Sequence, residues 1–405
     1  MRFYGLLTAL MCMTPPSAAQ CESNWSLESA QTELGVVAGH CTAFDEVRGV
    51  HVLLRGDQVW EHAGPGDQWR LVAEGVIPPR GAAGMCWDRI RHRIVVYGGE
   101  GGGGKYNDIW AWDGQTWEQW TNGTNGPSGR NYVAIAHDVE RDRFVMFGGY
   151  DSSLRGDTWE WSHQLGWQQV STGGPEGLYA HRMVYDDERQ VCVLHGGYYF
   201  FNRNETWTWD GNTWTLASNG SGPARYVFSM AWDSLRKQVV CFSGTQCCPE
   251  SESQEEWRWD GGSWSQCSNV LDVPGRGYTD WSYDSWRDEL RIVGGFGIPQ
   301  GQSARVALSD AWVNALGGDL DDCDGDGIPD HVEISNNLAC DANLDGLPDA
   351  CVCPQDLDCD GSVGMTDLML LLEQWGMANT DFDFDEDGFV DFHDLLGLLR
   401  AFGTC

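Results

Sequence analysis

The stretch Ile94-Val-Val-Tyr-Gly-Gly99, followed by Trp110-Ala-Trp112 and Trp117, is the clearest copy of a unit that recurs along the chain. Each copy opens with a short run ending in Asp, and the Asp residues at 88, 138, 186 and 233 lie 50, 48 and 47 positions apart. Periods near fifty residues are typical of solenoids and propellers. The other clear copies are 144–149 with Trp159, Trp161 and Trp167; 192–197 with Trp207, Trp209 and Trp214; and 239–244 with Trp257, Trp259 and Trp264.

Two weaker copies flank these four. Residues 291–295 follow Asp284 and lead to Trp312, whereas residues 50–56 follow Asp45 and keep only the single glycine Gly56. Within each copy, four apolar or alternating runs are separated by Gly, Asp, Asn and Pro, which predicts a four-stranded antiparallel meander. Six such meanders predict a mainly β fold, and a glycine content of 52 in 405 residues fits the many tight turns it needs.

An apolar strand ending in Gly-Gly, with spaced Trp residues behind it, resembles the kelch repeat over roughly residues 24–316. The resemblance implies a six-bladed kelch-type β-propeller, which we assign to residues 20–318. The sixth copy has no fourth run after Trp312, while the segment around Trp25 matches one. We therefore expect residues 24–30 to close the last blade, because closure removes exposed sheet edges.

The paired Trp residues and the loops after the double glycines carry different signals. Trp residues two apart share one face of a strand, so they serve either as packing between blades or as platforms for sugar rings; recurrence in several blades favours packing. The loops after the double glycines differ between copies and emerge on one face, which marks a candidate binding face. In one such loop, the four aromatics 198–201 form either an exposed patch or a plug in the channel mouth.

Composition changes abruptly after Gly317-Gly318. Residues 319–405 hold 22 acidic residues against the single base Arg400, and their spacing matches calcium-binding loops, in which alternate oxygens converge on one ion. We predict Ca²⁺ as the cofactor. The predicted ligands are Asp322, Asp324, Asp326, Ile328, Asp330 and Glu333; Asp341, Asn343, Asp345 and Asp349; Asp356, Asp358, Asp360, Ser362 and Asp367; and Asp383, Asp385, Asp387, Phe389 and Asp394.

The last two loops each open a Leu-rich helix and lie 27 residues apart, which resembles a type I dockerin, a paired loop-helix domain of the EF-hand kind, over residues 355–405. Residues 319–354 resemble thrombospondin type 3 calcium repeats. The first resemblance implies a cohesin-like or cell-surface protein as partner of the tail. It also implies contacts just after each loop, where Met365-Thr366 and Phe392-His393 differ from the matched hydroxyl pair usual in cellulosomal dockerins.

The first nineteen residues read as a signal peptide, with Arg2, an apolar run and a cleavage site after Ala19. We therefore expect a secreted protein. Eight cysteines from Cys21 to Cys267 and six from Cys323 to Cys405 then predict disulfides. A net charge of −35 excludes nucleic acid as partner, and no apolar run is long enough to span a membrane.

Two hypotheses of function remain. The first is a non-catalytic secreted binding protein, with a polysaccharide or protein ligand on the propeller loop face and a calcium-stabilised tail that anchors it. The second is a secreted carbohydrate-active enzyme of polysaccharide breakdown, with its site in the propeller channel. The sequence contains no Gly-x-Ser-x-Gly or His-Glu-x-x-His motif, which favours the first. Carboxylates or histidines converging on the channel mouth would favour the enzyme, and an aromatic mouth would favour binding.

Overall fold

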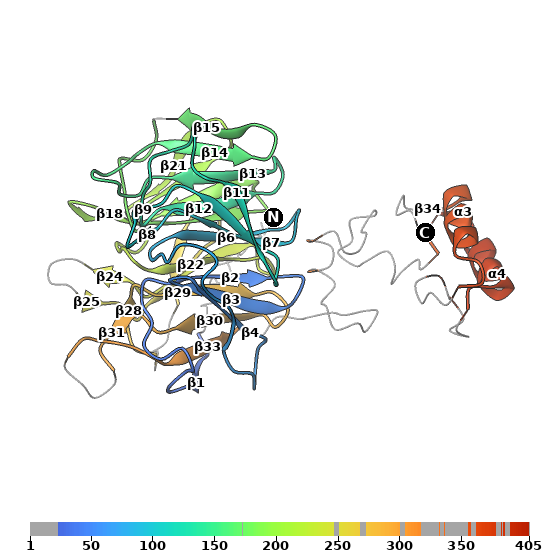
Figure 1. The fold of residues 1–405 in the computed structure, drawn as a ribbon, viewed down its shortest axis with the longest axis horizontal. Coiled ribbons are helices and arrows are strands. Elements are labelled where there is room, and N and C mark those ends of the chain that lie inside the picture. The colour runs from blue at the N-terminus through green and yellow to red at the C-terminus, as the bar shows by residue number, and fades with distance from the viewer. Residues whose placement is uncertain are drawn as a thin grey trace, which may run out of the picture.

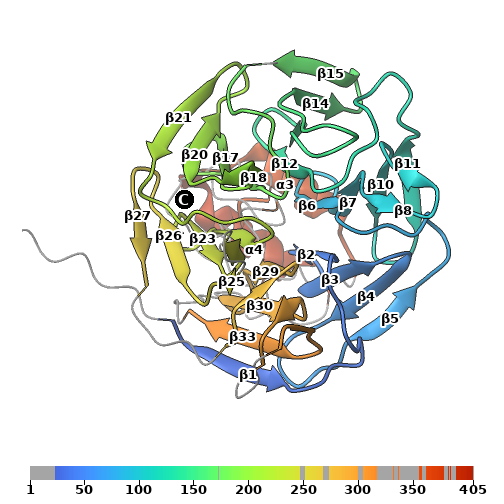
Figure 2. The ribbon, with the colours of Figure 1, turned by 90° about the vertical axis from the view of Figure 1, so that its left-hand side faces the viewer.

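The computed structural model describes residues 23–171, 173–246, 251–267, 273–299 and 304–316, and in the tail Val332, Asn336, 355–357, 362–377, Phe382, Phe384 and 389–404. Within these residues the chain is mainly β, with six four-stranded antiparallel sheets and the two short helices α3 and α4 (Figure 1). Figure 2 shows the sheets set side by side around a central axis, which is a propeller-like arrangement.

In each sheet the inner strand lies nearest the axis, and the inner strands of successive sheets contact one another. From the inner strand outward the sheets are β2 (Cys41–Asp45), β3 (Val50–Arg55), β4 (Gln58–His62) and β5 (Arg70–Ala73); β6 (Gly84–Asp88), β7 (Arg93–Tyr97), β10 (Ile109–Trp112) and β11 (Trp117–Thr121); β12 (Ala134–Asp138), β13 (Arg143–Phe147), β14 (Thr158–Ser162) and β15 (Gly166–Ser171); β16 (Arg182–Asp186), β17 (Val191–His195), β20 (Glu205–Trp209) and β21 (Trp214–Asn219); β22 (Ser229–Asp233), β23 (Gln238–Phe242), β26 (Glu256–Trp259) and β27 (Trp264–Gln266); and β29 (Asp280–Asp284), β30 (Glu289–Val293), β33 (Ala311–Ala315) and β1 (Trp25–Ser29).

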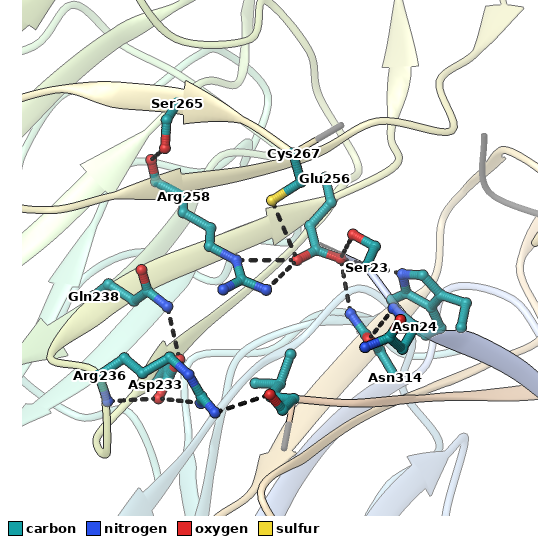
Figure 3. A network of polar contacts seen from close by, with 12 residues as sticks. Ser23, Asn24, Asp233, Arg236, Gln238, Glu256, Arg258, Ser265, Cys267 and Asn314 are labelled. Atoms are coloured by element: carbon teal, nitrogen blue, oxygen red, sulfur yellow. Dashed lines mark hydrogen bonds and ion pairs between the residues drawn. The ribbon is translucent and has the colours of Figure 1, made fainter. Parts of the chain in front are cut away.

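The N-terminal strand β1 is the outermost strand of the sheet whose other strands come from the end of the repeat region. Trp25 pairs with Asn314 and Leu27 with Trp312. Side-chain contacts add to this strand pairing. Buried Glu256 accepts hydrogen bonds from Ser23 Oγ (2.7 Å), Trp25 Nε1 (3.2 Å) and Asn314 Nδ2 (2.8 Å). Figure 3 shows those from Ser23 and Asn314. Residues nearly three hundred positions apart are thus held together by one carboxylate.

The second strand of each sheet is its most deeply buried element. Ile94, Val95, Val96 and Tyr97 of β7 have no exposed surface, because neighbouring sheets cover both of its faces. The strand ends in Gly98 and Gly99, whose φ angles of 68° and 92° suit glycine. A Cβ on Gly98 would lie 2.8 Å from the carbonyl oxygen of Arg130, so the next sheet approaches too closely for any side chain.

A buried arginine links the start of an inner strand to the loop before the third strand. Arg130 donates to both carboxylate oxygens of Asp157 (2.7 and 3.2 Å) and to the carbonyl of Gly148 (2.9 Å), and Trp159 Nε1 donates to the same carboxylate. We call this ion pair an arginine clasp. It recurs as Arg80 with Asp108, Arg225 with Glu255 and Arg276 with Asp310. The first Trp of a pair is thereby tied to its own sheet, while the second Trp is buried, as at Trp112, Trp161, Trp209 and Trp259.

Short hairpins and bridges extend from the sheets at the face where the double-glycine loops emerge, which we call the loop face. They are β8 (Glu100–Gly101), β9 (Gly104–Lys105), β18 (Tyr198–Tyr199), β19 (Phe201–Asn202), β24 (Thr245–Gln246), β25 (Ser251–Glu252), β28 (Arg276–Gly277), β31 (Phe296–Gly297) and β32 (Val306–Ala307). The opposite face carries the turns after the inner strands, and we call it the hairpin face.

In the tail, helices α3 (Met365–Glu373) and α4 (Phe392–Ala401) contact each other and share a small core of Val363, Leu371, Val390 and Leu398. β34 (Ser362–Val363), before α3, pairs with β35 (Gly403–Thr404), after α4. Val390, before α4, exchanges hydrogen bonds with Gly376 and Met377, after α3. Each loop is therefore closed by the residues that follow the other helix.

The described cysteines include both free thiols and a disulfide-bonded residue. Cys41, Cys86, Cys192 and Cys241 carry free thiols, and burial raises the pKa of Cys41 and Cys241 to about 12. Within the described residues, Cys267 is disulfide-bonded. The four thiols sit in strands as small apolar side chains, which their position in the sequence alone did not reveal.

Candidate binding face

Six residues form a ring at the loop-face end of the channel, which we call the collar: Gly39, Ala82, Tyr132, Ala180, Val227 and Tyr278. The backbone N–H of each donates to the carbonyl of the one before it, and Gly39 donates to Tyr278, with distances of 2.8–3.1 Å. All six have positive φ angles, between 47° and 71°. Such angles are costly for Val, Ala and Tyr, so the closed ring of hydrogen bonds compensates a strain repeated in five of its members.

Tyrosine side chains cover the collar. Tyr132 and Tyr278 meet edge to face at 6.3 Å, although they belong to loops three sheets apart, and Tyr179 contacts Tyr132 at 5.7 Å. Tyr198 and Tyr226 continue the cluster, with ring centroids 5.3 Å apart. Burial, and then the neighbouring tyrosines, raise the pKa of Tyr132 to about 12, so its hydroxyl stays protonated. Rings from opposite sides of the ring of sheets therefore meet over the channel.

Exposed aromatic side chains surround this cluster. We call Tyr150, Phe200, Phe201 and Phe296 the aromatic rim; their exposed fractions are 39%, 76%, 56% and 37%. Tyr150 and Phe296 contact Tyr179 and Tyr278 of the cluster. The loop 198–201 divides between the two expected roles, because Tyr198 packs in the tyrosine cluster while Phe200 and Phe201 are exposed at the end of the β18–β19 hairpin.

Cations lie over the rim rings. The guanidinium of Arg203 lies 4.5 Å from the ring centre of Phe201, that of Arg305 lies 5.4 Å from Phe296, and Lys105 Nζ lies 4.1 Å from Tyr150. Arg203 is ion-paired with Glu176 and Glu205, and Arg305 with Glu252. Lys105 donates to the carbonyl of Asp151. The face therefore combines exposed rings with charges that already have partners.

Below the collar lies a central cavity of about 190 Å³, lined mostly by apolar side chains of the inner strands. Arg182 crosses it, donating to the carbonyls of Phe228 (2.7 Å) and Thr279 (3.1 Å), and lies 3.3 Å from Asp280. Burial raises the pKa of Asp280, an effect that Arg182 opposes. This pair fastens three neighbouring sheets together, and Arg89, which also lines the cavity, is paired with Glu46 and Asp187.

At the hairpin face, a tail residue reaches the cavity lining. Asn336 is fully buried; its amide donates to Glu46 (2.9 Å) and accepts from Trp87 Nε1 (3.1 Å), and its carbonyl oxygen lies 3.2 Å from His92 Nε2. Glu46 and Trp87 both line the cavity. Asn336 of the tail is thus in direct contact with two sheets.

Three histidines of the repeats are buried among the sheets. His137 and His195 lie in β12 and β17, and His181 directly precedes β16. Burial lowers the pKa of His181 and His195 to about 3. In the described residues, no group of three His, Cys, Asp or Glu side chains is placed to hold a metal ion.

Five of the predicted calcium ligands lie in the described residues, and four of them form two equivalent pairs between the tail loops, Ser362 with Phe389 and Asp367 with Asp394. Asp367 and Asp394, both predicted twelfth ligands, are buried at the starts of α3 and α4. Asp367 accepts from the backbone N–H of Leu357 and Gly364, and Asp394 from those of Phe384 and Asp391, at 2.6–2.7 Å. Asp356 is buried, Ser362 starts β34, and Phe389 exposes its ring.

These positions fit a hard cation. A buried carboxylate that accepts two backbone N–H groups keeps further lone pairs, and carboxylate and carbonyl oxygens are what Ca²⁺ prefers. The remaining predicted ligands lie outside the described residues: Asp322, Asp324, Asp326, Ile328, Asp330, Glu333, Asp341, Asn343, Asp345, Asp349, Asp358, Asp360, Asp383, Asp385 and Asp387.

The class that this arrangement defines is a mainly β protein with a propeller-like fold, and comparison with known proteins goes no further. No protein-family model matches the chain, and no curated sequence matches it. Among solved structures, the chain is similar to the one titled "Structure of YjhT", with a TM-score of 0.55, 14% identity, and coverage of 69% of this chain and 95% of that one. At that identity the similarity shows the fold alone. No helix among the described residues is long and apolar enough to cross a membrane.

Sequence reasoning missed the collar tyrosines and the Arg182–Asp280 pair. Tyr132 and Tyr278 both lie six residues before a repeat Asp, and Arg182 and Asp280 both lie four before one, so alignment of the repeats on that Asp would have brought each pair to one level of the channel. The other repeats carry small or uncharged side chains at those levels, so the Tyr, Arg and Asp residues are the departure that could have been noticed.

Proposed function

We propose that the protein is an exported calcium-binding protein in which the six sheets are the blades of a closed kelch-type propeller. In this proposal the propeller binds an extracellular polysaccharide or protein on its loop face, and the dockerin-like tail anchors it to a cohesin-like or cell-surface partner. The observation that carries the proposal is the loop face itself, where exposed rings surround tyrosines that meet over the channel.

Closure of the propeller is supported by two features. The collar hydrogen bonds form a closed ring, because the N–H of Gly39 donates to the carbonyl of Tyr278. In addition, β1 completes the sheet of β29, β30 and β33. A closed ring offers a rigid support for loops, so the loop face keeps its shape without a ligand, which lowers the entropic cost of binding.

The calcium part of the proposal rests on the tail loops. Asp367 and Asp394 accept hydrogen bonds from equivalent backbone N–H groups. Each of the two loops is closed by residues that follow the helix of the other loop. A calcium ion at each loop would neutralise the clustered carboxylates and hold the loop ends together, so that ion binding adds to the folding energy of the helices. The exposed apolar residues Met365, Phe392, Leu372 and Leu399 occupy matching positions on α3 and α4 and offer a partner surface.

The alternative function, a carbohydrate-active enzyme with its site in the channel, is favoured by one observation. Asp280 is a buried carboxyl with a raised pKa beside the cavity, which is the environment of a general acid. Its partner Arg182 is fully engaged with three neighbours, and the tyrosines separate this pair from the loop face.

One screen separates the two functions. The full-length protein with calcium is tested against immobilised polysaccharides and extracellular proteins, and soluble products are analysed in parallel. The binding protein retains a ligand without forming products, and loses it when Phe200 and Phe201 are replaced by Ala. Product formation that depends on Asp280 would instead establish the enzyme.

A further inference from the structure

The loop face carries an aromatic residue in a conformation that glycine or asparagine would adopt at lower cost. Phe200 has φ 56° at the tip of the β18–β19 hairpin, and 76% of it is exposed. A bulky residue in the left-handed region costs on the order of 1 kcal/mol, and this one contributes little to any core. Its ring contacts only Tyr199 among the aromatic contacts of the described residues, at 4.6 Å. Strain without packing benefit points to a role in recognition.

The neighbouring Phe201 has a cation over one face of its ring. Arg203 covers one face of that ring, and Phe201 still exposes 56% of its surface. Arg203 is ion-paired with Glu176 and Glu205. A ligand that stacks on the phenylalanines therefore meets a guanidinium and two carboxylates that are already paired.

The charges of this face compensate one another. Arg203 and Arg305 both have Glu partners, and Lys105 donates to the backbone carbonyl of Asp151. An anionic ligand would have to break these pairs or lie against Glu176, Glu205 and Glu252, whereas paired donors and acceptors suit hydroxyl groups, which both donate and accept.

The shape of the face adds a further condition. Tyr132 and Tyr278 meet over the channel, so a ligand lies on the rim instead of inserting an end into the channel. Rim rings come from the loops of three sheets, at Tyr150, Phe200 and Phe296, which together form a platform wider than a single ring.

From these features we propose that the aromatic rim binds internal units of a neutral polysaccharide, whose C–H faces stack on Phe200 and Phe201 and whose hydroxyls bond the paired charges. This rests on the proposed function, since it names the ligand of the same loop face. Uncharged sugar rings combine an apolar face with many hydroxyls and no net charge, which is the combination that the rim offers.

The test is affinity electrophoresis of the full-length protein with calcium, in gels containing neutral polysaccharides (a glucan, a mannan and a xyloglucan) or acidic ones (polygalacturonate and alginate). We expect at least one neutral polysaccharide to retard the protein and the acidic ones not to. Phe200→Ala and Phe201→Ala should each weaken binding about tenfold, the size of one aromatic contact. Leu216→Ala, an exposed apolar residue on the outer strand β21, is the matched control and should change nothing.

Other outcomes overturn the proposal in distinguishable ways. Retardation by acidic polysaccharides alone, or capture of an extracellular protein that Phe200→Ala abolishes, would refute the neutral-polysaccharide ligand and leave the loop face as the binding surface. Neutral binding that both phenylalanine variants retain, with unchanged melting temperature, would refute the aromatic rim as the site and the loop face as the binding surface.

Discussion

Tyr132 and Tyr278 touch edge to face at 6.3 Å although three sheets separate their places in the ring. Both are held in left-handed backbone conformations by the collar of hydrogen bonds, which aims their rings inward from opposite sides. The loop face therefore presents an aromatic surface above the cavity, on which we propose that the ligand lies.

Loss of the N-terminal strand should destabilise the whole sheet region. Deleting residues 20–31 removes β1 and leaves β33 with an unpaired edge, so we expect aggregation and a lower melting temperature. The single substitution Glu256→Ala removes the acceptor of Ser23, Trp25 and Asn314 and leaves Arg258 without this partner, at a cost of about 3 kcal/mol. Glu188→Ala, at a surface pair, is the control and should be nearly neutral. A soluble deletion variant with unchanged melting temperature would contradict the role given to β1.

The arginine clasps should matter more than surface ion pairs. Arg130→Met leaves Asp157 without its bidentate partner and frees the carbonyl of Gly148, and we expect a loss of about 3–5 kcal/mol in the free energy of unfolding. Arg70→Met removes an exposed ion pair with Asp67 and should cost less than 1 kcal/mol. Denaturant unfolding of both variants measures the difference; equal effects would show that the clasp is dispensable.

Acidification should destabilise the propeller before its carboxylates titrate. Burial lowers the pKa of His40, His62, His181 and His195 to about 3 and of His51 to about 4. A histidine in the unfolded chain titrates near pH 6.5. Below that pH the unfolded chain therefore binds protons that the folded chain does not bind. Stability is therefore complete above pH 6.5 and falls as the pH is lowered toward 3, by up to about 1.4 kcal/mol per pH unit for each histidine.

The variant His195→Gln checks this assignment. His195 accepts at Nδ1 from Thr206, whose hydroxyl in turn accepts from Trp264, and donates at Nε2 to Pro223, which fixes the neutral form. The substitution should lower stability at pH 7.5 but flatten its dependence between pH 6.5 and 4.5. If His195→Gln leaves the slope of stability against pH unchanged, other groups cause the acid sensitivity.

Removal of calcium should unfold the tail helices and spare the sheets. Hydrogen exchange of the full chain, followed by peptide mass spectrometry, should show protection of α3 and α4 with calcium and its loss with excess chelator, because Asp367 and Asp394 would repel the other carboxylates of their loops. Peptides of β7 and β13 should exchange equally slowly in both conditions. Asp356→Ala and Asp383→Ala should each weaken one site, measured by calcium titration calorimetry. Equal protection of the helices with and without calcium would refute the calcium requirement.

The repeat period, the apolar strand before Gly98-Gly99 and the Trp pairs were sufficient to predict four-stranded sheets, because they are local and recur. The clasp of Arg130 with Asp157 was not predicted, since it joins residues 27 positions apart that only the folded sheet brings together. Aligning the repeats could have placed Tyr132 and Tyr278 at one level, but not the hydrogen-bonded ring of the collar. Its left-handed Tyr132 and Val227 depart from local backbone preference and are held by hydrogen bonds between sheets. In the tail, spacing predicted Asp367 and Asp394 as equivalent, and their matching backbone contacts have that symmetry.

The most direct measurement compares ligand binding by two full-length variants, one on the loop face and one in the cavity. For the ligand found by screening, Phe200→Ala/Phe201→Ala should abolish or strongly weaken binding, whereas Asp280→Asn should bind like the original chain, provided that both variants keep their melting temperature. Retained binding by the phenylalanine variant together with loss in Asp280→Asn would contradict the account and place recognition in the channel.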